Sequence, residues 1–295
     1  MKIGINMLLW ATQVTRDHVV QLKQIKAAGA DGVEIPIMEG EVAHFRQLGQ
    51  ILDDLGLERT SAMAMVSPAA NPVSDDPKVR QAATDQMRWL IECAAALGAP
   101  VICGPMFQTL GVFTGHAPTE TEKRRVVEML QGVAPLAAQA QVVLALEPLN
   151  RFEAHMVNTT ADGAALVKRV GHPNVGLLYD TFHANIEETD PVGAIRKHGK
   201  WIRHFHCSAN HRGIPGQDHV PWLESFRALR AVPYDDWLVI EAFGRALPGL
   251  AAATKIWRDL FPSNIAVARQ GYRSSARPGK PAPATKEQHD APAQP

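Results

Sequence analysis

The sequence predicts a (β/α)8 barrel folded as a single domain. Eight segments that resemble strands alternate with eight that resemble helices over residues 1–262, which is the repeat of such a barrel. Strand-like runs such as VVLAL and VGLLY are apolar on both faces, as in a parallel sheet covered by helices. A doubly wound open sheet is the alternative, but no GxGxxG motif follows the first strand, which disfavours it.

Glycines mark the ends of several helical segments and justify the element boundaries. A helix-like segment, a glycine and a short β-rich run recur around Gly29, Gly56, Gly98, Gly171 and Gly199. Glycine is favoured just after a helix because it accepts a left-handed backbone without a steric penalty. Each following strand then begins within a few residues, as in a short helix-to-strand loop.

The elements follow from this pattern in chain order. We predict strands at 3–9, 32–37, 58–64, 100–104, 142–147, 175–180, 202–207 and 237–242. We predict helices at 16–28, 41–55, 75–97, 119–139, 160–169, 190–198, 221–230 and 248–260. Beyond the barrel, residues 263–272 read as a C-terminal extension, and 273–295 as a disordered tail rich in Pro, Ala and charge.

Composition limits the classes of function. Thirty basic and thirty acidic residues cancel, so no global field favours nucleic acid or an anionic membrane, and a small neutral ligand or a partner protein is expected. No apolar run approaches the ~20 residues of a membrane helix, and MKIGINMLLW reads as a first strand rather than a secretory signal. Cys93, Cys103 and Cys207 lack metal-ligand spacing, and their odd number suits a reducing compartment, so we expect a cytoplasmic protein.

Four consecutive units place a metal-binding side chain at or near the end of a strand. Glu147 follows VVLAL, Asp180 follows VGLLY, His206 lies in HFH and Glu241 follows WLVI, and the active site of such barrels lies at these strand ends. Taken singly, each has a structural explanation: a salt bridge, a helix cap, a core histidine or a charged rim. Together without a cation they would repel one another, so we predict a divalent site suited to Mn²⁺ or Mg²⁺, with Co²⁺ as a further option.

Three more polar residues follow these ligands on loops. Glu153 lies six residues after Glu147, His183 three after Asp180, and Arg212 six after His206. Loops concentrate binding groups, so these side chains indicate a pocket for a polyhydroxy compound. A rim of solvated charge explains the same residues equally well.

Several motifs resemble those of one enzyme family. The segments EPLNRFE, YDTFHANIEE and HFHCSANHRGIPG, followed by PW and IEAFG, occur in the order found in ketose 3-epimerases, as do ANPVSDDPKVRQAATDQMRWLIECAAALGAP and the GPMF turn. This group comprises D-tagatose, D-psicose and L-ribulose 3-epimerases within the xylose-isomerase-like TIM barrels. The resemblance spans residues 1–262.

The resemblance implies a function and roles for the candidate residues. It implies interconversion of free ketoses at C3 through a cis-enediolate, such as D-tagatose/D-sorbose, D-fructose/D-psicose or L-ribulose/L-xylulose. One divalent ion per subunit, usually Mn²⁺ or Mg²⁺, would bind to Glu147, Asp180, His206 and Glu241 and to the C2 and C3 oxygens of the ketose. Glu147 and Glu241 would exchange the C3 proton on opposite faces. The resemblance further implies a homodimer or homotetramer, and a substrate held at O1 to O3 by Glu153, His183 and Arg212.

One loop departs from the family pattern. Ala209 stands where a glutamate is common, Asp218 follows GIPGQ where PGxG is common, and His211 is unusual. These changes put sugar preference in question without touching the four ligands. Rival functions are a hydroxypyruvate isomerase, an inosose dehydratase, an aldose–ketose isomerase, an abasic-site endonuclease of this fold, or a non-catalytic sugar-binding barrel.

Overall fold

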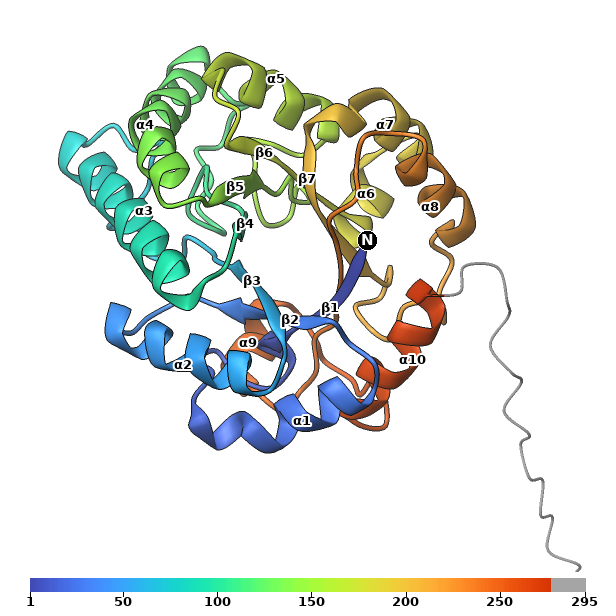
Figure 1. Cartoon of the computed structure of the whole chain (residues 1–295). Coiled ribbons are helices and arrows are strands. Elements are labelled where there is room, and N and C mark those ends of the chain that lie inside the picture. The colour runs from blue at the N-terminus through green and yellow to red at the C-terminus, as the bar shows by residue number, and fades with distance from the viewer. Residues whose placement is uncertain (277–295) are drawn as a thin grey trace, which may run out of the picture.

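Eight parallel strands close into a barrel in the computed structural model, which describes residues 1–276 (Figure 1). Each strand pairs with the next along the chain, and β8 pairs with β1, as the sequence predicted. The strands are β1 Lys2–Asn6, β2 Gly32–Pro36, β3 Glu58–Ala62, β4 Val101–Gly104, β5 Val143–Leu146, β6 Val175–Asp180, β7 Ile202–Ser208 and β8 Trp237–Glu241.

Helices form the outer layer around this barrel (Figure 1). They are α1 Val19–Ala27, α2 Val42–Asp54, α3 Pro77–Leu97, α4 Glu120–Gln139, α5 Thr160–Val170, α6 Thr181–Glu187, α7 Pro191–His198, α8 Trp222–Arg230, α9 Pro248–Ala253 and α10 Asn264–Ala276. Short 3-10 turns cover Met7–Leu9, Arg16–His18 and Gly199–Trp201. None of the helices within residues 1–276 is both long and apolar enough to cross a membrane.

The eighth predicted helix begins where expected but is shorter than expected. The expected helix 248–260 ends at Ala253, because Lys255 adopts a left-handed backbone with φ 61° that no glycine announces. α10 takes its place and contacts α1, β1 and β8, with Val267 and Ala268 buried.

The boundary of the tail was also set too early. α10 continues to Ala276, so residues 273–276 belong to a helix, although their Arg and Ser content had suggested a tail. The remainder of the predicted tail, 277–295, lies outside the described residues.

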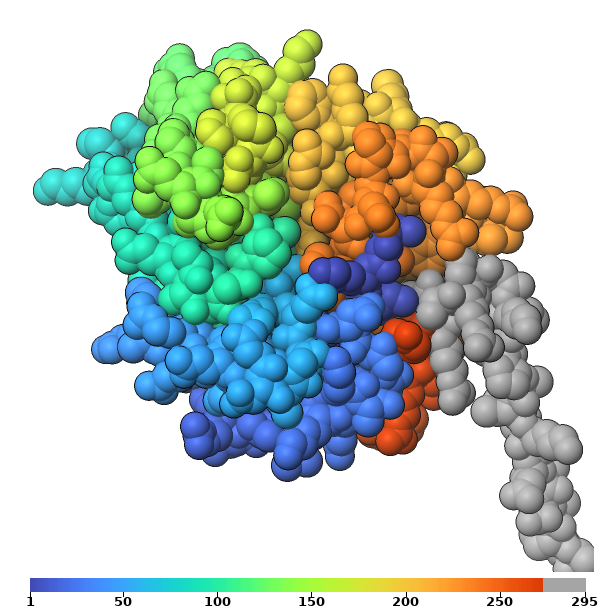
Figure 2. Space-filling view, viewed as in Figure 1, coloured from blue at the N-terminus to red at the C-terminus, as the bar shows by residue number. Residues whose placement is uncertain are grey.

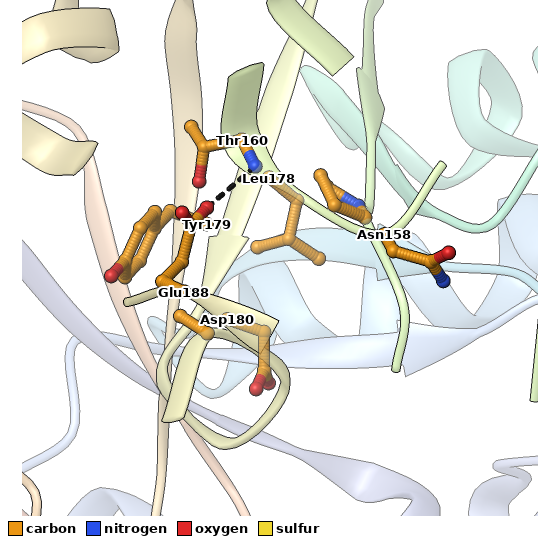
Figure 3. Close-up of a pocket in the computed structure, with 8 residues that line it drawn as sticks. Asn158, Thr160, Leu178, Tyr179, Asp180 and Glu188 are labelled. Carbon is orange, nitrogen blue, oxygen red and sulfur yellow. Dashed lines mark hydrogen bonds between the residues drawn. The ribbon is translucent and has the colours of Figure 1, made fainter. Parts of the chain in front are cut away.

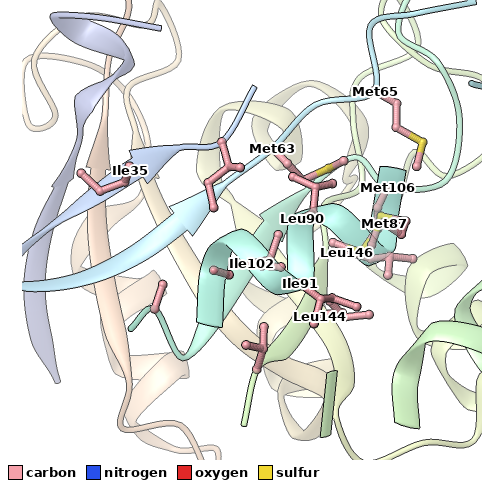
Figure 4. Close-up of a cluster of buried hydrophobic side chains, with 14 of the residues drawn as sticks. Ile35, Met63, Met65, Met87, Leu90, Ile91, Ile102, Met106, Leu144 and Leu146 are labelled. Atoms are coloured by element: carbon pink, nitrogen blue, oxygen red, sulfur yellow. The ribbon is translucent and has the colours of Figure 1, made fainter. Parts of the chain in front are cut away.

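Alternate strand residues build two different interiors. Outward-facing side chains pack under the helices, and Figure 4 shows Ile102, Leu144 and Leu146 of β4 and β5 beside Leu90 and Ile91 of α3. Inside the barrel, small and aliphatic side chains form a separate cluster that includes Ala62, Val101, Cys103, Ala145 and Leu178. Polar side chains occupy inward positions of other strands, and they form the site.

The barrel contains no open channel on the face shown in Figure 2. Side chains fill the ring, and the first residues of the chain, in dark blue, lie near its centre. This is the packed interior expected of a barrel of eight strands.

Candidate metal centre and active site

The structure brings the four predicted ligands together. Asp180 and Glu241 are the last residues of β6 and β8, Glu147 directly follows β5, and His206 lies within β7. One ligand atom from each residue lies within 4.8 Å of those from the other three, and all four residues are buried. The strand register explains part of this convergence, because Asp180 pairs with His206.

Asp180 caps a helix and still faces the centre. Its Oδ1 accepts hydrogen bonds from the backbone N–H groups of Phe182 (2.6 Å) and His183 (3.0 Å), which caps α6. Its Oδ2 accepts from Ser208 Oγ at 2.7 Å. The structural and functional explanations of this residue are therefore compatible, because one oxygen caps while the other remains at the site.

The carboxylates of the cluster carry opposite pKa shifts. Burial, followed by the charges of Glu241 and Asp180, raises the pKa of Glu147 well above its ordinary value. Burial acts in the same direction on Asp180, but the neighbouring His206 ring and the charge of Arg212 outweigh it and lower the pKa of Asp180. Like charge thus accumulates at one centre, which favours a cation there.

His206 presents one ring nitrogen to this centre. Its Nε2 lies 2.7 Å from Glu34 Oε1, whereas its Nδ1 lies 3.4 Å from Glu241 Oε1 and 3.6 Å from Asp180 Oδ2. This buried Nδ1 makes no hydrogen bond with any of the described residues. Burial alone would lower the pKa of His206, but the carboxylates of Glu34 and Glu241 raise it well above 6.5.

These observations fit a divalent cation. Three carboxylate oxygens and one unpaired imidazole nitrogen form a hard donor set, which suits Mn²⁺ or Mg²⁺. In the metal-free chain, a proton on His206 partly offsets the negative charge. A bound cation would replace that proton.

Glu34 is the site residue that the sequence analysis missed. It lies on β2, fully buried, and both its oxygens accept hydrogen bonds, from His206 and from His204 Nε2 at 2.6 Å. Burial would raise its pKa, but these two histidines hold it well below 4.5. A signal existed: in GVEIP the neighbours Val33 and Ile35 face the outer helices, so strand alternation points Glu34 inward.

A second group of possible ligands lies beneath the first. It comprises Glu34, Cys103, His204 and His206. The possible ligand atoms of this second group already form hydrogen bonds with one another. Cys103 Sγ lies 3.2 Å from Glu34 Oε2, and both histidines contact the Glu34 carboxylate. We therefore interpret it as the hydrogen-bonded floor of the site.

Arg212 is buried against this cluster. Its Nη1 lies 2.6 Å from Glu241 Oε2 and 3.6 Å from Asp180 Oδ2. Its guanidinium lies 3.8 Å from the ring centre of Phe182 and 4.9 Å from that of Phe243. The two aromatic rings and the carboxylates fix this side chain, which excludes the solvated rim charge considered from the sequence.

Two hydrogen-bond donors point at each other beside the cluster. His183 Nδ1 accepts from the backbone N–H of Asn150 at 2.9 Å, so its Nε2 carries the proton when the ring is neutral. Burial, with the nearby charge of Arg212, lowers the pKa of His183 to about 3, which keeps the ring neutral. Its Nε2 then faces Arg212 Nη2, also a donor, at 3.0 Å, and Glu147 Oε1 at 3.5 Å. An oxygen-rich ligand would supply the acceptor that this pair lacks.

Glu153 lies on the loop between β5 and α5. Its Oε1 accepts from Asn150 Nδ2 at 2.9 Å, and its backbone oxygen accepts from Gly111 N at 2.9 Å. The Asn150 side chain also lies 3.1 Å from His183 Nδ1. Glu153 and His183 are therefore tied through one asparagine.

Comparisons with known proteins agree with this geometry. The family model described as "Xylose isomerase-like TIM barrel" matches residues 22–262. L-ribulose 3-epimerase of Mesorhizobium japonicum (strain LMG 29417 / CECT 9101 / MAFF 303099) is 31% identical over 272 residues, 91% of each chain. The chain belongs to the ketose 3-epimerase family of these barrels. Membership in a family of epimerases makes it an enzyme of the isomerase class.

Solved ketose 3-epimerases share the fold over nearly the whole chain. A structure of an L-ribulose 3-epimerase is 30% identical, with a TM-score of 0.86, and 92% of each chain is covered. A D-psicose 3-epimerase from Clostridium cellulolyticum H10, solved with D-tagatose, is 28% identical, with a TM-score of 0.84 over 93% of this chain and 96% of that one.

The loop that departs from the ketose 3-epimerase pattern is held by hydrogen bonds within the loop. Ala209 is fully buried, and its backbone oxygen accepts from Arg212 N at 2.8 Å. Asp218 accepts from the backbone N–H groups of Gly216 and Val220 and from Trp222 Nε1. The half-buried ring of His211 lies against Gly213. Asp218 therefore has a structural task in this loop.

A small cavity lies behind Asp180. Its volume of about 10 Å³ is enough for one water, and Leu178 and Tyr179 of β6 line it. Figure 3 shows the backbone nitrogen of Thr160 donating to Glu188 beside it, a bond of 2.7 Å. This bond joins the start of α5 to the end of α6, and it supports the helix that Asp180 caps.

Proposed function

We propose that the chain epimerises free ketoses at C3 with the help of one divalent cation, preferably Mn²⁺. The observation that carries the proposal is the convergence of Glu147, Asp180, His206 and Glu241, with one ligand atom of each within 4.8 Å of the others. Family membership supports C3 as the reacting carbon. Candidate substrates are D-tagatose, D-fructose and L-ribulose.

The C3–H bond next to a ketone is weakly acidic, so its cleavage needs a base and a means of stabilising negative charge. A bound divalent cation would supply electrostatic stabilisation of the oxygens on C2 and C3. We assign Asp180 and His206 to holding that cation and the two glutamates to both holding it and moving the proton.

Glu147 is suited to accept the C3 proton. Burial raises its pKa, and a carboxylate with a raised pKa is a stronger base. Glu241 would return a proton to the opposite face, since inversion requires two groups flanking the same carbon. Asn6 Nδ2 (3.3 Å) and Arg212 Nη1 (2.6 Å) hold the two oxygens of Glu241.

The remaining candidate residues would bind the sugar hydroxyls. The opposed donors of His183 and Arg212, 3.0 Å apart, are well placed to share a ketose oxygen. Glu153 would accept a hydrogen bond from a hydroxyl, since an ionised carboxylate has only acceptors. We assign these three residues to O1 to O3.

The test is proton exchange at C3. Purified chain with Mn²⁺ is incubated in D₂O with D-fructose, D-tagatose or L-ribulose, with and without chelator. We expect a C3-epimeric product with deuterium at C3, and loss of exchange with chelator. Glu147→Gln and Glu241→Gln should each abolish formation of the C3 epimer while still binding cation, and near-normal turnover in either variant would refute its role.

Other outcomes identify the rival functions. Label at C1 would indicate an aldose–ketose or hydroxypyruvate type of isomerase, and loss of water would indicate a dehydratase. Binding of a ketose without any exchange would indicate a sugar-binding barrel. Each of these results would overturn the proposal of C3 epimerisation.

A further inference from the structure

The carboxylate of Glu34 is surrounded by donors on every side. Its Oε1 accepts from His206 Nε2 at 2.7 Å and from Asn6 Nδ2 at 3.0 Å. Its Oε2 accepts from His204 Nε2 at 2.6 Å, Thr60 Oγ1 at 2.9 Å and Cys103 Sγ at 3.2 Å. Glu34 is fully buried, so this group has exchanged water entirely for protein donors.

These contacts fix the orientation of the carboxylate. His204 and Thr60 hold the oxygen that points away from His206, so the group cannot rotate without losing both. Asn6 donates to Glu34 Oε1 and also, at 3.3 Å, to Glu241 Oε1. One amide thus links Glu34 to the cation centre.

The consequence falls on His206. A neutral imidazole has one N–H and one lone pair. With the proton on Nε2, donated to Glu34, the lone pair is on Nδ1, which faces Glu241 and Asp180. In the opposite tautomer an N–H would point at the centre, and His206 could not be a ligand.

We propose that Glu34 is a positioning residue that selects the tautomer and ring orientation of His206 and thereby sets the affinity of the site for its divalent cation. This inference rests on the proposed function. Partners of this kind on a ligating histidine commonly account for 10–100-fold in metal affinity. Glu34 makes no contact with the substrate in this role, so its effect passes through His206.

The test compares Mn²⁺ dissociation constants in metal-stripped protein, measured from the electron paramagnetic resonance signal of free Mn²⁺. Glu34→Gln keeps the shape and leaves one acceptor oxygen. Its amide N–H₂ can still meet His204 Nε2, because the unpaired, buried Nδ1 of His204 can take the proton. The amide oxygen still accepts from His206 Nε2, but it lacks the charge that makes a carboxylate acceptor about twice as strong, so it holds the tautomer and orientation of His206 less firmly. We expect folded Glu34→Gln to bind Mn²⁺ about 10–100-fold more weakly, with turnover partly restored by excess Mn²⁺.

A matched control separates the positioning of His206 from a general loss of hydrogen bonds around Glu34. Thr60→Val removes another donor from the same carboxylate but leaves the His206 contact, so its Mn²⁺ dissociation constant should match the wild type. If Glu34→Gln does not fold, Glu34→Asp retains the charge but withdraws it from His206, and the same weakening is expected.

The results distinguish this inference from the proposed function. If the wild type binds Mn²⁺ and Glu34→Gln binds it equally well, the inference fails and the cation site stands. Equal weakening in Thr60→Val would also overturn it, by showing a merely structural role. If the wild type binds no Mn²⁺, both the cation site and the inference fall.

Discussion

At the scale of the residue, Glu147 works against the stability of its own fold. Its pKa is raised by burial and by two neighbouring carboxylates, so the folded chain holds a proton there more tightly than the unfolded chain. That contribution to stability is present below the ordinary pKa and is lost as pH rises through the raised value. At neutral pH Glu147 therefore destabilises the metal-free chain, because folding requires this carboxylate either to stay charged beside two others or to take up a proton.

Removal of this charge should stabilise the protein while it destroys the activity. We expect Glu147→Gln to raise the melting temperature of the metal-free chain at neutral pH, because the amide has nearly the same shape and no charge to repel Glu241 or Asp180. Thermal unfolding in the presence of chelator measures this. Glu39→Gln, at an exposed position, is the control and should change nothing; a lower melting temperature for Glu147→Gln would contradict the electrostatic account.

Individual residues also show what the sequence could predict. Glu147, Asp180, His206 and Glu241 could be located because each lies at or near the end of a strand and strand ends meet in a barrel. Glu34 could not be recognised in the same way, because it lies in mid-strand and its partners come from β1, β3, β4 and β7. Strand alternation can place a mid-strand carboxylate inside the barrel, but its hydrogen-bond partners become known only when the barrel closes.

At the scale of the element, two loops support the substrate side of the site. Gln108, fully buried on the loop after β4, accepts at Oε1 from the backbone N–H groups of His155 (3.0 Å) and Met156 (2.9 Å). Its Nε2 donates to Val112 O at 3.1 Å. Gln108 therefore joins its loop to the loop that carries Glu153.

Loss of this join should loosen the loop of Glu153. Gln108→Ala leaves two backbone donors without an acceptor, which should lower the free energy of unfolding by about 1–3 kcal/mol and raise KM for the ketose. Urea denaturation and steady-state kinetics measure the two effects. Gln81→Ala, on the exposed face of α3, is the matched control, and an unchanged KM in Gln108→Ala would show that the join does not position Glu153.

The elements were predictable where local signals agree with the tertiary fold. All eight strands were anticipated, because glycines at helix ends and strands that are apolar on both faces are features of the local sequence. α6 was missed because Thr181–Glu187 is short and amphipathic signals need more than two turns. α10 was missed because its helical state depends on packing against β1, β8 and α1, which no local pattern encodes.

At the scale of the whole molecule, cation binding should add stability in a pH-dependent way. A cation that binds only the folded chain stabilises it by about 2.7 kcal/mol at 100 times its dissociation constant. The carboxylates of Glu34 and Glu241 overcome the effect of burial and raise the pKa of His206. The metal-free chain therefore keeps a proton on His206 until the pH exceeds this raised value, and a cation must displace that proton.

The increase in melting temperature caused by Mn²⁺ should consequently be larger at about pH 8 than at about pH 6. Thermal unfolding with and without Mn²⁺ at the two pH values measures it. His18→Gln, remote from the site on the turn Arg16–His18, should retain the same pH dependence. A larger increase at the lower pH would contradict competition between proton and cation.

The pairing of the first and last strands determines when the barrel can close during synthesis. β8 must pair with β1 across most of the chain length, so a ribosome has to deliver Glu241 before the sheet can become a cylinder. Until then Glu147 and Asp180 lie on an open sheet in which β1 lacks its partner β8. α10 is translated after β8 and packs against both β1 and β8. Nascent chains should thus acquire the ability to capture a cation only after β8 has been translated, in a single step.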